Sequence, residues 1–489
     1  MQNLEYIFHP RSIAVVGASN NPLSIATRLF FLSSLKKMGF KGEIYPIHPK
    51  ENEVAGLKVY PSVLDVPGPV DHVICAIKAH FTPKMMQDCA QKGVKTVHLF
   101  TSGFSETGEE KGICLEREIV DIAHKGGVRV IGPNCMGLYC PSSGLSFDSS
   151  FPKEAGSVAF LSQSGGNSIE LVQLGKTRGV HFSKVISYGN ACDLNEADFM
   201  EYLADDPETK VITCYIEGVK EGGHFIQALS KATKSKPVIV LKGGLTEAGT
   251  GAVASHTGAL AGSVQTWNTL FQQLGVVQAY DLEEIIDLVL LFQSINPPRG
   301  RRGAAVGVGG GFSVLASDNC EREGLIVPSF PPQLRKELRT IVPEELDPGT
   351  SVGNPVDLSG SGWNTDIFSR ALTTIANFEG IDFLLIFSAV AFGLYKGTNI
   401  MVEQQVNTLI EVKKDIDKPI IMVERSSGDP AVAPFVHDVE QKCLAARIPV
   451  YPSTIRAARA TSKFIQYYER KSKAEASVTS TLKWRIKPA

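Results

Sequence analysis

The chain has 489 residues, enough for about three domains, and its 49 Lys and Arg residues nearly balance its 51 Asp and Glu residues. The net charge of -2 gives no electrostatic basis for binding nucleic acid or an anionic membrane surface. The first residues lack the apolar core of a signal peptide, and no apolar run approaches the ~18 residues that a membrane helix needs. Nine scattered cysteines without a CxxC pair indicate reduced thiols. We therefore expect a cytoplasmic protein that binds neither nucleic acid nor membranes.

Short apolar runs alternate along the chain with stretches of helical periodicity, which is the pattern of parallel sheets covered by helices. We predict an α/β protein with domains over residues 1–140, 150–293 and 303–468. The second and third domains resemble two copies of one module, because each opens with a strand and a Gly-rich turn and later contains a Lys-Pro strand. Residues 469–489 are polar and rich in Ser, Thr and Lys, which predicts a loosely ordered tail.

The first strand, SIAVVG at residues 12–17, leads into a predicted helix. Asn21 fits its N-cap, Pro22 fits its first turn and Gly39 fits its end. Free main-chain N–H groups at the start of such a helix, with the helix dipole behind them, predict a phosphate-binding turn. The residues of this turn are Gly17, Ala18, Ser19 and Asn20.

The bound phosphate could belong to NAD or to coenzyme A (CoA), and the end of the next strand helps to separate them. NAD binding requires GxGxxG and an acidic residue for the ribose hydroxyls, whereas here Gly17 stands without the other glycines. The next strand ends in His48, Pro49 and Lys50. A cation suits a phosphate, so Lys50 favours the phosphorylated ribose of CoA. An ordinary surface lysine is the alternative.

A second phosphate loop is predicted at LSQSGG, residues 161–166. The Ser164 hydroxyl and the N–H groups of Gly165 and Gly166 are available there to an anion. The loop is not a nucleophile elbow, because Ser162 stands where GxSxG requires glycine. In the turn GPNCMG, Cys135 is interpreted as a small buried residue and not as a nucleophile.

The segment KGGLTEAGTGAVASHTGALAG, residues 242–262, surrounds His256 with residues too small to bury it. This composition predicts a mobile loop. A neutral imidazole there suits a nucleophile that accepts a group and passes it on. The alternative is a histidine in a Gly/Ala-rich surface loop without a chemical role.

Together, the motifs of the chain resemble, in order and spacing, those of the NDP-forming acyl-CoA synthetases, the succinyl-CoA synthetase-like family. The motifs are GASNNP, YPIHPK, TSGFSE, IGPNCMG, LSQSGG, YIEG, the His256 segment and NPVD. The chain most closely resembles the alpha subunit of ADP-forming acetyl-CoA synthetase. This resemblance implies a Rossmann-like CoA-binding domain followed by two flavodoxin-like, doubly wound domains.

The resemblance also implies a reversible reaction of acyl-CoA, phosphate and ADP to give acid, CoA and ATP, through an acyl phosphate and a phosphohistidine at His256. Glu217 of YIEG resembles the carboxylate that hydrogen-bonds this histidine. Thr101, Ser102 and Asn134 are expected to border CoA. ATP or ADP with Mg would bind a separate ATP-grasp beta subunit, because this chain has no P-loop and no length for that domain. An alpha2-beta2 heterotetramer is expected.

One region departs from the family pattern, since Pro22, Leu23 and Ala26 stand where Pro-Gly and a further Gly are usual. These bulkier residues would narrow the nucleotide groove. Two alternative functions follow: a CoA-binding regulatory protein without catalysis, and an NAD-dependent oxidoreductase, which the missing glycines and Lys50 disfavour. Asp193 and Glu196 have a spacing typical of metal ligands, but we interpret them as a turn and a helix start. No metal is expected on this chain.

Overall fold

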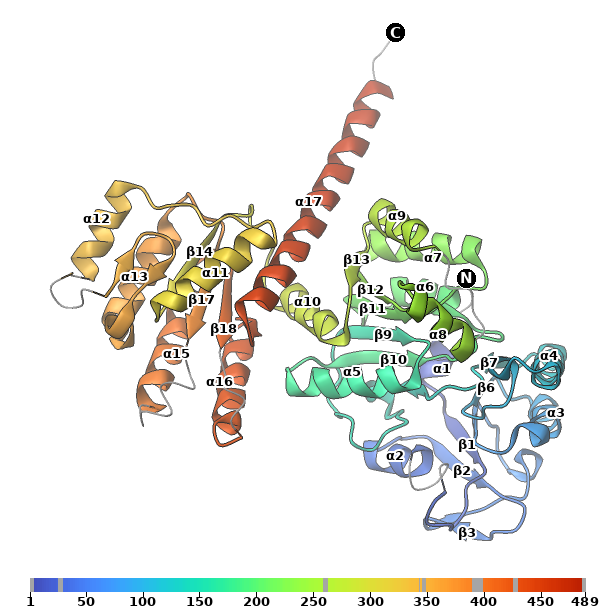
Figure 1. The fold of residues 1–489 in the computed structure, drawn as a ribbon. Coiled ribbons are helices and arrows are strands. Elements are labelled where there is room, and N and C mark those ends of the chain that lie inside the picture. Colours follow the sequence, from blue (N-terminus) through green and yellow to red (C-terminus); the bar gives the residue numbers. More distant parts are fainter. Residues whose placement is uncertain are drawn as a thin grey trace. The chain divides into compact units, whose positions relative to one another are not determined.

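The computed structural model describes residues 4–24, 30–257, 263–342, 344, 349–388, 399–424 and 430–485 (Figure 1). The chain divides into two compact units, which are described separately. The first comprises Met1–Lys176 and Val180–Ile285, and the second comprises Thr177–Gly179 and Ile286–Ala489. Among the described residues, no helix combines the length and the apolar character required to cross a membrane.

The first unit opens with a five-stranded parallel sheet in the order β2-β1-β5-β6-β7. The strands are β1 (Ser12–Val16), β2 (Glu43–Ile47), β5 (His72–Cys75), β6 (Thr96–Leu99) and β7 (Arg129–Ile131), and the helices are α1 (Glu5–Phe8), α2 (Phe31–Met38), α3 (Thr82–Lys92) and α4 (Glu110–Lys125). Helices α3 and α4 lie together on one side of the sheet and α2 lies on the other (Figure 1). All five residues of β1 are buried, as in a central parallel strand covered on both faces. A short hairpin, β3 (Glu53–Val54) and β4 (Leu57–Lys58), follows β2.

The helix after the first strand differs in part from the prediction. Its described part is α2, which begins at Phe31, and Asn21 is not its N-cap. Instead, Asn21 Oδ1 accepts a hydrogen bond from the N–H of Leu23 at 2.9 Å, within a turn. Residues 25–29, which include Ala26, lie outside the described residues. Gly39 ends the helix as predicted, in a left-handed conformation with φ 79°.

The second sheet of this unit has six strands in the order β13-β12-β11-β9-β10-β8, and only β8 is antiparallel. The strands are β8 (Gly137–Tyr139), β9 (Val158–Ser162), β10 (Phe182–Ser187), β11 (Val211–Ile216), β12 (Val238–Lys242) and β13 (Val277–Ala279). The helices are α5 (Gly165–Thr177), α6 (Glu196–Asp205), α7 (Gly222–Ser235), α8 (Glu247–Thr257) and α9 (Val264–Leu274), and α10 (Leu282–Ser294) carries the chain from this unit into the second. Because the chain reverses direction across the sheet at β9, the carboxyl ends of β9 and β11 flank a topological switch point, where ligands bind in such folds.

The second unit contains a six-stranded sheet in the order β15-β16-β14-β17-β18-β19. Its strands are β14 (Gly303–Gly307), β15 (Ser351–Val352), β16 (Val356–Asp357), β17 (Phe383–Ser388), β18 (Ile420–Glu424) and β19 (Val450–Tyr451). Its helices are α11 (Gly310–Arg322), α12 (Pro332–Ile341), α13 (Thr365–Asn377), α15 (Asn399–Lys414), α16 (Ala433–Ala445) and α17 (Thr454–Arg485). The predicted α/β class is confirmed by these three largely parallel sheets.

The C-terminal region differs from the expected loose tail, because residues 469–485 continue the 32-residue helix α17. The sequence here is rich in Lys, Ala, Glu and Arg, which are good helix formers. Polarity alone therefore does not predict disorder in this segment.

Candidate active site

The turn after β1 packs closely against the end of the neighbouring strand β5. Gly17 has φ 95°, and a Cβ at this position would lie 2.8 Å from the carbonyl oxygen of Ala76, after β5. Only glycine fits there without displacing the neighbouring strand end. Ala18 is buried, whereas Asn20 is exposed.

A carboxylate already lies against this turn, which the sequence did not predict. Glu51 Oε1 accepts the Asn20 main-chain N–H at 3.3 Å, and Glu51 Oε2 accepts from the Asn20 side chain at 2.8 Å. Ser19, next to it, is half-buried, and Lys50 is exposed beside Glu51. The turn therefore binds an anionic group of the chain itself, with the predicted cation adjacent.

The other residues expected to contact CoA differ in whether their polar groups are accessible to a ligand. Thr101 is buried, and its hydroxyl donates to the carbonyl of Ile77 at 2.7 Å, so its role here is structural. Ser102 is exposed. Asn134 adopts φ 57° and donates its main-chain N–H to the carbonyl of Thr101 at 3.0 Å. The structure therefore brings the TSGFSE and GPNCMG loops together.

The predicted second phosphate loop connects β9 to the 13-residue helix α5. The Ser164 hydroxyl accepts the N–H of Asn167 at 3.2 Å, which is the usual role of an N-cap serine. Gly165 and Gly166 form the start of the helix, and Gly166 is exposed. These N–H groups and the dipole of α5 can stabilise an anion, whereas the Ser164 hydroxyl also serves the helix.

Glu217 follows β11 beside this loop and is only 3% exposed. Gln163 fixes its main chain: the Gln163 amide oxygen accepts from the N–H groups of Glu217 and Gly218, the latter at 3.0 Å. The Gln163 amide nitrogen donates to the carbonyl of Gly218 at 3.1 Å. The Glu217 carboxylate is thus presented from a rigid strand end next to the amino end of α5.

Tyr215 orients the Glu217 carboxylate. Its hydroxyl donates to Glu217 Oε1 at 3.1 Å and is also hydrogen-bonded by the side chain of Asn167 from α5. Tyr215 and Glu217 are two positions apart at the end of β11, so both side chains point to the same face. Sequence reasoning missed Gln163, Tyr215 and Lys242, although their positions at strand ends were a signal that could have identified them.

The expected mobile loop around His256 is partly helical. The backbone of His256 belongs to the last turn of α8, while its side chain and residues 258–262 lie outside the described part of the chain. Thr246 caps this helix, since its hydroxyl accepts the N–H of Gly249 at 3.1 Å. Alanines at helix-interior positions favour this conformation.

Cys135 and Asp193 have structural roles. Burial raises the pKa of the Cys135 thiol, which lies 3.7 Å from the carbonyl oxygen of Leu99, so a thiolate nucleophile is disfavoured. The Asp193 carboxylate accepts from Arg129 Nε at 2.9 Å and from the N–H of Val130 at 2.8 Å. It joins the first two sheets and is not positioned as a metal ligand.

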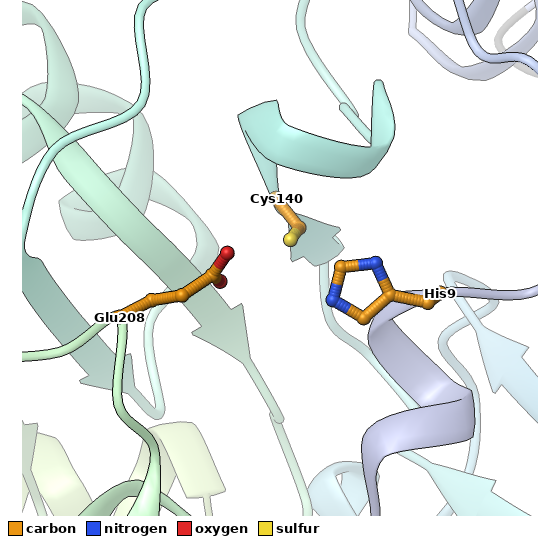
Figure 2. Close-up of side chains that lie close together, drawn as sticks. All are labelled: His9, Cys140 and Glu208. Carbon is orange, nitrogen blue, oxygen red and sulfur yellow. The ribbon is translucent and has the colours of Figure 1, made fainter.

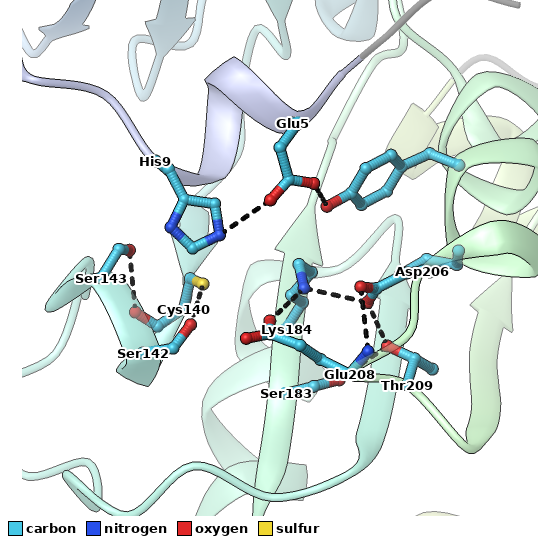
Figure 3. A network of polar contacts seen from close by, with 12 residues as sticks. Glu5, His9, Cys140, Ser142, Ser143, Ser183, Lys184, Asp206, Glu208 and Thr209 are labelled. Carbon is cyan, nitrogen blue, oxygen red and sulfur yellow. Dashed lines mark hydrogen bonds and ion pairs between the residues drawn. The ribbon is translucent and has the colours of Figure 1, made fainter.

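One group of potential metal donors occurs among the described residues: His9, Cys140 and Glu208, whose ligand atoms lie within 4.8 Å of one another (Figure 2). A protein cation is already present there, because Lys184 Nζ donates to Glu208 at 2.6 Å and to Asp206 at 2.9 Å (Figure 3). Burial raises the pKa of the Cys140 thiol, which disfavours the thiolate that a metal requires. We interpret this cluster as the partly exposed edge of an ion-pair network whose Lys184 and Asp206 are buried.

Comparison with known proteins agrees with this geometry. Residues 11–141 match the CoA binding domain, and residues 155–292 match the succinyl-CoA ligase like flavodoxin domain. The alpha subunit of ADP-forming acetate–CoA ligase II from Pyrococcus furiosus is 42% identical over 368 residues, which cover 75% of this chain and 79% of the relative. An ADP-forming acetate–CoA ligase I from Archaeoglobus fulgidus is 36% identical, over a match that covers 78% of this chain and 54% of that relative.

A solved structure is similar over almost the whole chain. The acetyl-coenzyme A synthetase 1 of Ca. Korarchaeum cryptofilum, in complex with phosphate and ADP, has a TM-score of 0.80 and 33% identity. The match covers 98% of this chain and 99% of that one. With the matching domains and the alpha-subunit relatives, these similarities show that the chain belongs to the family of ADP-forming acetate–CoA ligases and corresponds to their alpha subunits.

Proposed function

We propose that this chain carries out the thioester and phosphohistidine steps of an ADP-forming acyl-CoA synthetase. The overall reaction converts acyl-CoA, inorganic phosphate and ADP to a carboxylic acid, CoA and ATP, and it is reversible. The observation that carries this proposal is the rigid placement of Glu217, buried beside the amino end of α5 at the switch point of the second sheet.

Two groups of residues assist the transfer of the phosphoryl group to His256. Phosphate oxygen attacks the thioester carbon, the C–S bond breaks, and CoA leaves as the acyl phosphate forms. His256 then attacks phosphorus, and the carboxylate departs. The N–H groups of Gly165 and Gly166, with the dipole of α5, stabilise the phosphoryl charge. The Glu217 carboxylate accepts a hydrogen bond from the imidazole, which fixes its tautomer and stabilises the positive charge that develops there.

The first domain binds CoA in this proposal. The turn at Gly17, Ala18, Ser19 and Asn20 holds a CoA phosphate, with Lys50 at the phosphorylated ribose, while Ser102 and Asn134 border the thiol end. Thr101 supports these two through its main chain. ADP and Mg bind an ATP-grasp beta subunit, in an alpha2-beta2 heterotetramer in the cytoplasm.

The experiment is to incubate the purified chain with inorganic phosphate and a panel of acyl-CoAs, and then to measure intact mass. We expect one added acid-labile phosphoryl group with at least one acyl-CoA. The control is His256→Asn, which should stay unlabelled. His437→Asn is a matched second control, because His437 is an exposed histidine of α16 in the other flavodoxin-like module.

Two outcomes would contradict the proposal. Label that persists in His256→Asn would place the phosphoryl group on another residue. A wild-type chain that stays unlabelled with every acyl-CoA, even with the beta subunit present, would mean that the site is inactive and that the protein is a CoA-binding regulatory module.

A further inference from the structure

Lys242, the last residue of β12, is a buried lysine at the active-site edge of the second sheet, and the reaction steps above do not use it. Its side chain is 3% exposed. Lysine is rarely buried, because taking its ammonium group out of water is unfavourable unless that group is well hydrogen-bonded. Burial lowers the pKa of Lys242 to about 8, and the negative charge of Glu217 opposes this shift. A lysine maintained in this environment calls for an explanation.

The ammonium group contacts three separate pieces of the candidate site. Lys242 Nζ donates to the main-chain carbonyl of Glu217 at 2.7 Å and to that of Gly243. It also lies 5.1 Å from the centroid of the Trp267 ring, a cation–π distance. Glu217 follows β11, Gly243 opens the segment that carries His256, and Trp267 belongs to α9, which follows that segment.

Each of the three partners is itself fixed. Gln163 binds the main-chain N–H of Glu217 and Lys242 binds its carbonyl, so both main-chain polar groups of Glu217 have a partner. Gly243 lies so close to Tyr215 that a Cβ would approach its hydroxyl oxygen to 2.8 Å. The Trp267 ring packs edge-on against Phe225, with centroids 5.8 Å apart. The ammonium therefore joins rigid groups at both ends of the His256 segment.

We propose that Lys242 is a positioning residue for phosphoryl transfer: it ties the Glu217 backbone to both ends of the segment that carries His256. Lys242 does not touch the transferred group. It sets where the segment leaves the sheet and where it returns to α9, so that His256 and the Glu217 carboxylate can meet. This inference rests on the proposed function of His256 and Glu217.

The test compares three substitutions in the full chain. Lys242→Met keeps most of the length of the side chain and removes its charge and its hydrogen-bond donors, whereas Lys242→Arg keeps the charge and the donors. The matched control is Lys236→Met. Lys236 precedes the same strand and is a half-buried lysine that likewise donates to two main-chain carbonyls, those of Leu203, at 2.6 Å, and Asp206. It lies at the opposite end of β12 from the site.

Three quantities are measured: the rate of His256 phosphorylation by rapid quench, the dissociation constant of the acyl-CoA, and amide hydrogen exchange over residues 243–257. Lys242→Met should slow phosphorylation by about 100-fold, as expected when reacting groups are displaced by about 1 Å. Acyl-CoA affinity should change less than about twofold, because the first domain is untouched, and exchange of the segment should accelerate. Lys242→Arg should recover part of the rate, and Lys236→Met should match the wild type.

The outcomes separate this inference from the function on which it rests. If the wild type is labelled and Lys242→Met is labelled at the same rate, the positioning role is wrong and the proposed function stands. Equal losses in Lys242→Met and Lys236→Met would reveal a general stability effect and would also overturn the role. If Lys242→Met does not fold, Trp267→Leu decides, since loss of the ring contact should accelerate exchange of the segment and slow phosphorylation. An unlabelled wild type overturns both proposals.

Discussion

Replacing Gln163 with alanine would release the main chain that carries Glu217. Three main-chain groups lose their partner in this variant: the N–H groups of Glu217 and Gly218 and the carbonyl of Gly218. A buried polar group without a partner costs about 1–3 kcal/mol, and water can enter the polar space left by the side chain. We therefore take the low end for each of the three groups and expect the free energy of unfolding to fall by about 3 kcal/mol.

The same variant should lose activity while it is still folded. A displacement of Glu217 by about 1 Å would slow phosphorylation of His256 by about 100-fold. Urea denaturation measures the stability loss. Rapid-quench labelling at low temperature, without urea, measures the rate. Gln173→Ala is the control, because Gln173 is on α5 and makes an exposed hydrogen bond to Ser150 at 2.6 Å. A stability loss below about 1 kcal/mol, or an unchanged rate, would refute the assignment of Gln163 as the support of Glu217.

Three further predictions concern single charged groups. Glu217→Gln keeps the shape of the side chain but removes its charge, so phosphorylation of His256 should slow by about 100-fold or more without loss of thermal stability; equal rates would exclude the carboxylate role. Lys50→Met should weaken CoA binding by about fivefold, as expected for an exposed ion pair of about 1 kcal/mol, and should leave dephospho-CoA binding unchanged. Calorimetry measures both affinities, and equal losses for the two ligands would show that Lys50 does not contact the ribose phosphate. Glu424, 1% exposed at the end of β18, has a pKa raised from 4.5 to about 7 by burial and then by Glu440. Because the folded-state pKa is the higher one, the free energy of unfolding should fall by about 3 kcal/mol as pH rises from 4.5 to about 7. Glu424→Gln should abolish that fall in denaturation experiments at pH 5 and pH 8, and an unchanged fall would contradict the assignment.

The elements that depend on local sequence could be predicted, and those that depend on distant contacts could not. Apolar periodicity predicted the parallel sheets, and Gly39 predicted the end of α2. The support of Glu217 by Gln163 joins residues 54 positions apart, and it exists only because β9 and β11 are neighbours in the sheet. Strand order is not encoded in periodicity, so these partners could not be read from the sequence.

The same distinction between local sequence and distant contacts applies to the site residues. The N-cap expected at Asn21 was wrong, whereas the end of β1 before the turn at Gly17 was predictable from its apolar run. The occupation of the Thr101 hydroxyl by the Ile77 carbonyl was not, since a threonine at a strand end reads equally as a ligand contact. The helix over residues 469–485 was missed because polar composition was given more weight than intrinsic helix propensity.

The carboxylate of Glu51 on the Asn20 amide has a consequence for how tightly a ligand phosphate can bind at that turn. A side chain of the same protein held against the turn, here from 31 positions along the chain, behaves as a competitor at an effective concentration on the order of millimolar or higher, whatever the ligand concentration in solution. A phosphate must displace it, so part of the intrinsic affinity is spent on that exchange. In the proposed function, Glu51 competes with the CoA phosphate for this turn, and removing its charge would increase the apparent affinity for CoA without adding any contact to the ligand.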